Sequence, residues 1–216
     1  GANSFVVLQG TFNTTARVNL QSGQTLMGSG TITVTTDSGR TLSVALPGAT
    51  IASSGGNTAA VGMATNSTLN GLTITNTQTT NALSAGVQAT GTVTGATITN
   101  NTITVTNTRN TADGISLVSN TGTSITVTNN TISATISGSS IGSAIALQAN
   151  QPTIKVSGNT LNATDNTAGG NNNYSVSLIN NTISSGSTGN KSSSGTCSTS
   201  GTITGSIGFT NGTTCP

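Results

Sequence analysis

Few side chains in this 216-residue chain could do acid–base or metal chemistry. Its ionisable side chains are three aspartates and five cations, namely Asp37, Asp113, Asp165, Arg17, Arg40, Arg109, Lys155 and Lys191. Acid–base cleavage of a glycosidic bond needs two carboxyl groups within several ångströms of each other, whereas these aspartates fall in different parts of the chain. Asp113 and Arg109 lie close in sequence, in TRNTADG, and this spacing predicts a surface turn pair.

Other common catalytic groups are missing from the sequence. The chain has no histidine and two cysteines, so neither a zinc site nor a serine triad can be assembled. We therefore predict that the protein is not an enzyme, with no catalytic residue, no bound metal and no cofactor.

The charge pattern excludes several kinds of partner. A net charge of +2, spread over five isolated cations, cannot form a polybasic groove, so neither nucleic acid nor an anionic membrane surface is expected to bind. No stretch of about 18 or more apolar residues occurs, so no membrane span is expected. So few charges also predict a folding stability that varies little with pH.

The two cysteines, Cys197 and Cys215, lie near the end of the chain. Their even number and close spacing favour a disulfide formed in an oxidising compartment, which predicts a secreted or cell-surface protein. Two free buried thiols in a cytosolic protein are the alternative.

The elements that carry these residues are best seen in SITVTNNTISAT, residues 124–135. Ile125 and Val127 alternate with threonines, the pair Asn129 and Asn130 interrupts, and alternation resumes at Ile132. Alternation with period two puts the apolar side chains on one face of a strand. Paired asparagines can adopt the left-handed conformation that a sharp corner needs. The stretch therefore predicts strand, corner, strand.

The same unit recurs along the chain at nearly constant spacing. We take one asparagine of each corner as its marker: Asn70, Asn101, Asn130, Asn159 and Asn181, at separations of 31, 29, 29 and 22 residues. The first asparagines of the NN pairs are Asn100, Asn129 and Asn180. A third strand recurs at Val87, Ile115 and Ile145. Three short strands per roughly 29 residues, with no helical period, predict an all-β parallel solenoid without a long helix.

These NNTI corners and three-strand coils resemble the right-handed parallel β-helix of the pectin-lyase-like superfamily, which includes bacterial surface and autotransporter passenger proteins. The resemblance covers about residues 70–186, and LQSGQTLMGSGTI resembles the opening coils of that fold. It implies a right-handed solenoid. Enzymes of this fold that act on polysaccharides use clustered carboxylates, which this chain does not supply.

The ends of the solenoid are predicted from where the repeat weakens. Residues 1–186 form the β-helix, with residues 1–17 as an N-terminal cap strand, and residues 187–216 form a loop and a disulfide-closed hairpin cap. Rings do not fit a ladder of Ile, Val and Leu, so the phenylalanines should lie at the ends. The predicted end-cap or assembly residues are Phe5, Val7, Phe12, Ile207 and Phe209.

Three functions remain compatible with these features. The ends lack the charges, prolines and helices that normally block strand edges, which favours self-association head to tail into a fibre or surface layer. A monomeric adhesin that binds a glycan or host surface is the alternative.

Ice binding is the third possibility. Two expected outward columns are interrupted, at Lys155 and at Ile179, and the cleaner column consists of Thr106, Thr135 and Thr164. Threonine on a solvent-facing strand is also ordinary for β-structure, so these columns alone do not demand a ligand.

Overall fold

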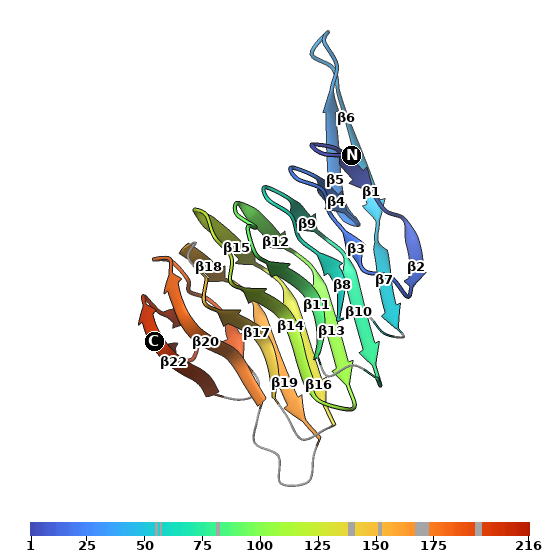
Figure 1. Cartoon of the computed structure of the whole chain (residues 1–216). Coiled ribbons are helices and arrows are strands. Elements are labelled where there is room, and N and C mark those ends of the chain that lie inside the picture. The colour runs from blue at the N-terminus through green and yellow to red at the C-terminus, as the bar shows by residue number, and fades with distance from the viewer. Residues whose placement is uncertain are drawn as a thin grey trace.

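The computed structural model describes residues 1–54, 56, 58–80, 83–137, 141–150, 153–166, 173–192 and 196–216. All regular elements in these ranges are β-strands, and the described residues contain no helix. The strands form a parallel solenoid in which paired residues of successive coils lie 29 residues apart, as Ile103 and Ile132 do (Figure 1). The predicted all-β solenoid with three strands per coil is confirmed.

Two parallel sheets form the walls of the solenoid. The long sheet contains β1 (Phe5–Val7), β4 (Thr25–Met27), β9 (Thr68–Asn70), β12 (Ala96–Thr99), β15 (Ser124–Thr128), β18 (Thr153–Ser157) and β20 (Asn173–Ile183), then β17 (Gly142–Gln148), β14 (Thr111–Val118), β11 (Leu83–Thr90), β8 (Ala59–Gly62) and β3 (Val18–Asn19). β22 (Thr196–Thr204) joins this sheet beside β20. The second sheet contains β2 (Gly10–Thr14), β7 (Ala49–Ser54), β10 (Thr73–Gln78), β13 (Thr102–Asn107), β16 (Thr131–Ile136), β19 (Thr160–Asp165) and β21 (Lys191–Ser192).

The core follows from the period-two pattern of each strand. Ile125 and Val127 of β15 are buried and lie opposite Ile154 and Val156 of β18. Aliphatic side chains thus stack on their counterparts at strand spacing, and the column continues from coil to coil. β-Branched residues suit these positions because they pack well on a pleated surface.

The register at the first marker differs from the sequence-based alignment. Asn70 lies opposite Thr99, whereas the position opposite Asn101 is held by Leu72, whose backbone N–H donates to Oδ1 of Asn101 at 3.0 Å. Ile74, not Leu72, is therefore the counterpart of the other buried isoleucines.

The last unit was also aligned wrongly. Val176 and Leu178 pair with Ile145 and Leu147 of β17, so they belong to the third strand of a coil. The long strand β20 then turns a corner within itself, and only its last residues pair with β18. Both corners of a coil carry asparagine, so an asparagine marker could not tell them apart.

The parallel coils extend beyond the predicted boundary at residue 186. β21 pairs with β19, and β22 pairs with β20. An antiparallel hairpin then forms from β23 (Ile207–Gly208) and β24 (Thr214–Cys215). Residues 193–195 of the predicted loop lie outside the described residues. At the other end, residues 1–17 contribute β1 and β2 to the first coil, rather than a single cap strand.

A second antiparallel hairpin, β5 (Ser29–Thr35) and β6 (Thr41–Pro47), interrupts the coils near their N-terminal end. β4 precedes it and pairs with β9, and β7 follows it and pairs with β10. Residues 28–48 therefore occupy the corner that Gly71 alone occupies in the next coil. The hairpin extends away from the coils past the N-terminal end (Figure 1).

Candidate functional site

The C-terminal end is closed by the hairpin β23–β24. Its Ile207 and Phe209 are buried, with 0% and 9% of their surface exposed. Cys215 in β24 is at disulfide-bonding distance from Cys197 in β22, with their Cα atoms 5.6 Å apart. The cysteines thus join the last coil to the hairpin, instead of closing a hairpin between themselves as predicted from the sequence.

A ladder of buried asparagines runs through one corner of successive coils: Asn101, Asn130, Asn159 and Asn190. The backbone N–H and Nδ2 of Asn101 both donate to Oδ1 of Asn130, at 2.9 and 3.0 Å. Nδ2 of Asn130 donates to the carbonyl of Ile98 at 3.0 Å and repeats the contact with the next asparagine. The side-chain amides therefore satisfy backbone groups that would otherwise be buried without partners at the corner.

The residue before each buried asparagine turns the chain. Asn100 and Asn129 are exposed and have φ of 56°, and at the same corner Gly71 and Gly158 have φ of 67°. Asparagine and glycine are the residues that tolerate this left-handed region best. In each NN pair the first asparagine therefore makes the turn, and the second fills the corner.

A second ladder occupies another corner of the same coils: Asn120, Asn150 and Asn181. Nδ2 of Asn120 donates to Oδ1 of Asn150 at 2.6 Å, and Nδ2 of Asn150 donates to Oδ1 of Asn181 at 2.9 Å. Asn181 therefore does not stack on Asn159, and its assignment to that ladder was wrong. Asn180, with φ of 51°, makes the turn at this second corner.

The second ladder was not predicted from the sequence, because two of its asparagines are not preceded by another asparagine. The turning residues are Ser119 and Ala149, with φ of 53° and 50°. A usable signal was nevertheless present. Each asparagine of the ladder follows by three residues a buried leucine of the third strand: Leu117, Leu147 and Leu178.

Asp113 is a buried carboxyl group, with 6% of its surface exposed. Burial raises the pKa of Asp113 from 3.8 to about 7, and hydrogen bonds with Ser116 and Ser143 oppose this rise. Arg109 does not pair with it, because Nη1 of Arg109 donates to the carbonyl of Thr80 at 3.0 Å. The predicted surface pair is wrong, and this titrating carboxyl argues against a stability that is insensitive to pH.

The N-terminal coil is open, unlike the C-terminal end. Its strands β1, β2 and β3 each pair on one side only. Phe5, Val7 and Phe12 are exposed by 55%, 40% and 43% of their surface. A pocket of about 280 Å³ opens beside them, lined by Val6, Leu8, Phe12, Val18, Gln24, Leu26 and Ile51. This end can therefore accept apolar side chains and further strands.

The outer face of the second sheet carries a column of threonines in register across six strands. They are Thr11, Thr50, Thr73, Thr102, Thr131 and Thr160. The predicted column of Thr106, Thr135 and Thr164 lies further along the same strands, also in register. The six-strand column was not recognised in the sequence, because its first members precede the clear repeat.

Two of the outward columns predicted from the sequence were assembled wrongly at their last member. Ser177 lies opposite Ala146, and Ile179 lies opposite Gln148, so neither continues the columns of Thr126 and Thr128. Lys155 does lie opposite Thr126 and interrupts that column.

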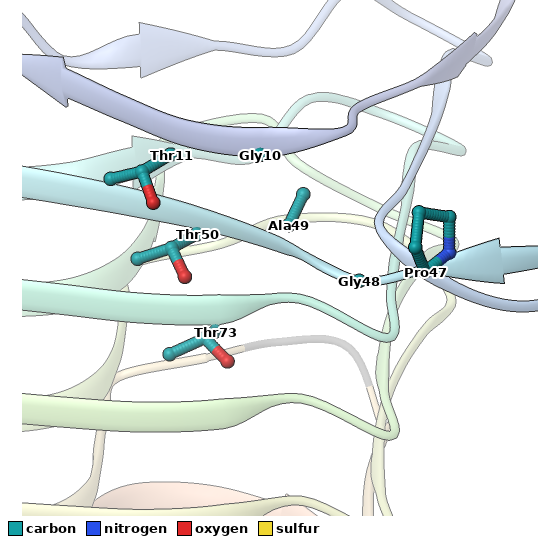
Figure 2. A pocket seen from close by; sticks show the side chains of 7 residues that line it. All are labelled: Gly10, Thr11, Pro47, Gly48, Ala49, Thr50 and Thr73. Carbon is teal, nitrogen blue, oxygen red and sulfur yellow. The ribbon is translucent and has the colours of Figure 1, made fainter.

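A polar cleft of about 320 Å³ lies at the N-terminal end of the six-threonine column. It is lined by Gly10, Thr11, Pro47, Gly48, Ala49, Thr50 and Thr73. Figure 2 shows the three threonines one above another with their hydroxyl groups on the same side, and the Pro47 ring beside them. The lining includes no charged side chain, so the cleft can exchange hydrogen bonds with a hydroxylated ligand but offers no acid or base.

The described part of the chain offers no further site of two common kinds. No group of three or more His, Cys, Asp or Glu residues there could hold a metal ion. None of the described residues forms a helix that could span a membrane. Comparisons with protein-family models, with curated proteins and with solved structures found no match to this chain.

Proposed function

We propose that this protein is a non-enzymatic, extracellular structural solenoid that associates with a second copy of itself through its N-terminal coil. The observation that carries the proposal is the open first coil, whose three free strand edges surround an apolar pocket and the exposed rings of Phe5 and Phe12. Free strand edges invite pairing with another chain, and exposed apolar surface gains free energy when it is covered.

The two ends differ in a way that favours contact between like ends. At the C-terminal end Ile207 and Phe209 are buried, and the exposed side chains of β22 are threonine and serine. A head-to-tail fibre would place the apolar coil on this polar end. Contact between two N-terminal ends instead matches apolar surface with apolar surface and closes as a two-fold dimer.

Charged substitutions at the open coil should abolish this association. We expect the Phe5→Asp and Phe12→Asp double variant to be monomeric at concentrations where the natural chain is dimeric, because buried unpaired carboxylates are costly. Sedimentation equilibrium over a concentration series measures this directly.

Ile141→Asp is the matched control. Ile141 is exposed to the same extent as Phe12, 43%, but lies in a later coil, so this variant should keep the dimer. A natural chain that stays monomeric throughout the series would refute the proposal and favour an adhesin. A mass that keeps growing with concentration would indicate the fibre.

An extracellular location is part of the proposal, supported by the cysteine pair. We also propose that the solenoid is right-handed and related to the pectin-lyase-like superfamily of bacterial surface and passenger proteins. The repeat of about 29 residues and the asparagine corners support that relationship. Right-handed crossovers are in addition the general rule between parallel strands.

Ice binding is a second candidate function, favoured by the six-threonine column. Five of its members are exposed, and their hydroxyl and methyl groups repeat at the spacing of adjacent strands, about 4.8 Å. Such an uncharged, regular face can order a layer of water, and the cleft at its end could equally hold a sugar.

Disruption of the column should reveal which of these applies. If the face binds ice, Thr102→Tyr with Thr131→Tyr should remove most thermal hysteresis. Thr126→Tyr should leave it unchanged, because Lys155 already interrupts that column. Absence of thermal hysteresis in the natural chain would eliminate ice binding, and a glycan array would then test the cleft.

A further inference from the structure

Hairpin β5–β6 is not needed to complete a coil. It fills a corner that the next coil turns with Gly71 alone, and the corners after that use single residues at the same position, Asn100 and Asn129. An insertion that the solenoid can do without, placed beside the open coil, calls for a role outside folding.

The hairpin has one apolar face. Ile32 lies opposite Val44, and Val34 lies opposite Leu42, so these four side chains share a face, while threonine and serine occupy the other. Val34, Leu42 and Val44 are exposed by 51%, 63% and 44% of their surface. A two-stranded hairpin is marginally stable by itself in water, so this face should gain from being covered.

The remaining exposed surface limits what could cover it. Among the described residues, the large hydrophobic side chains exposed outside the hairpin are Phe5, Val7 and Phe12 of the first coil and Ile141. All except Ile141 lie at the end past which the hairpin projects (Figure 1). A second copy docked at this end would bring the same apolar face to the same interface.

We infer that hairpin β5–β6 is a clasp, whose apolar face packs against the same face of the hairpin of a second copy. The inference rests on the proposed association through the N-terminal coil. Each strand of the hairpin has seven residues, which corresponds to a length of about 23 Å. In a two-fold pair each hairpin contributes the same contacts to the other, so two such faces can cover one another along their length.

Single cysteines test the contact between hairpins. Val34→Cys or Leu42→Cys should give disulfide-linked dimers on non-reducing gels after mild oxidation, because equivalent positions on the two apolar faces approach each other. The described part of the chain holds no free cysteine to compete, since Cys197 and Cys215 are paired. Thr33→Cys on the opposite face is the matched control and should cross-link at least tenfold more slowly. Equal rates at the two faces, or no cross-link at either, would overturn the clasp.

A deletion separates the clasp from the association itself. Residues 28–48 are replaced by one glycine, the residue that turns the next coil at Gly71. The solenoid should keep its circular dichroism spectrum, while the dimer Kd rises at least tenfold. An unchanged Kd would refute the clasp and leave the proposed association standing. A monomeric natural chain would refute both.

Discussion

Asn130→Ala is expected to lower the free energy of unfolding by about 3 to 5 kcal/mol. The substitution removes the acceptor of the Asn101 backbone N–H and the donor to the Ile98 carbonyl. Both groups lie deep in the corner, and a buried polar group left without a partner costs about 1–3 kcal/mol. The lost side-chain volume adds to this cost, because Asn130 is 1% exposed and no water can take its place without rearrangement. Urea unfolding followed by circular dichroism measures the change.

The neighbouring asparagine provides the control. Asn129→Gly should change stability by less than about 0.5 kcal/mol, because Asn129 is exposed at a φ of 56° that glycine adopts without strain. The chain itself uses Gly158 at this position of the next coil. Equal losses for Asn129→Gly and Asn130→Ala would contradict the division of roles within the NN pairs. A small loss for Asn130→Ala would contradict the structural importance of the ladder.

Folding stability is expected to rise as the pH falls from about 7 to about 4, by on the order of 4 kcal/mol. Burial raises the pKa of Asp113 from 3.8 to about 7, so between these values the folded chain holds a proton that the unfolded chain has released. Stability therefore increases with proton concentration across this window and is constant above it. The size follows from about 1.36 kcal/mol per pKa unit. Urea midpoints measured from pH 4 to pH 8 test the slope.

Asp113→Asn isolates the contribution of this carboxyl. Asparagine stays neutral and retains hydrogen-bonding groups for Ser116 and Ser143, so the variant should be more stable than the natural chain at pH 8 and equal to it at pH 4. Asp37→Asn, on the exposed hairpin β5–β6, should leave the slope as it is. A slope that survives in Asp113→Asn would show that another group causes the pH dependence.

The coils could be predicted from the sequence where local pattern and tertiary position coincide. Ile125, Val127 and Ile132 lie in the core as their alternation indicates, and Asn129 turns the chain as an asparagine before a buried asparagine should. The assignments failed where a spacing varied. Asn181 follows Asn159 by 22 residues, and the shorter separation reflects a different corner rather than a shorter coil.

The sites predicted from residue type behaved in a similar way. Cys197 and Cys215 pair, as their number and spacing indicated. Asp113 did not remain at the surface, since its burial depends on Ser116 in its own strand and on Ser143 in the next coil. No local pattern around TADG reports what the following coil places over it.

The period, the strands, the turning asparagines and the cysteine pair follow from the sequence alone, because each depends on residues adjacent in the chain or on one covalent bond. Which residues stack upon one another depends instead on the folded coils. Stacking is set by how many residues each corner and insertion contains, so the hairpin at residues 28–48 and the long strand β20 shift every later register. The two ends also differ only in the folded chain, one covered by Phe209 and the other left open beside Phe5 and Phe12. That difference arises from packing against the last coil, which no repeat within the sequence encodes.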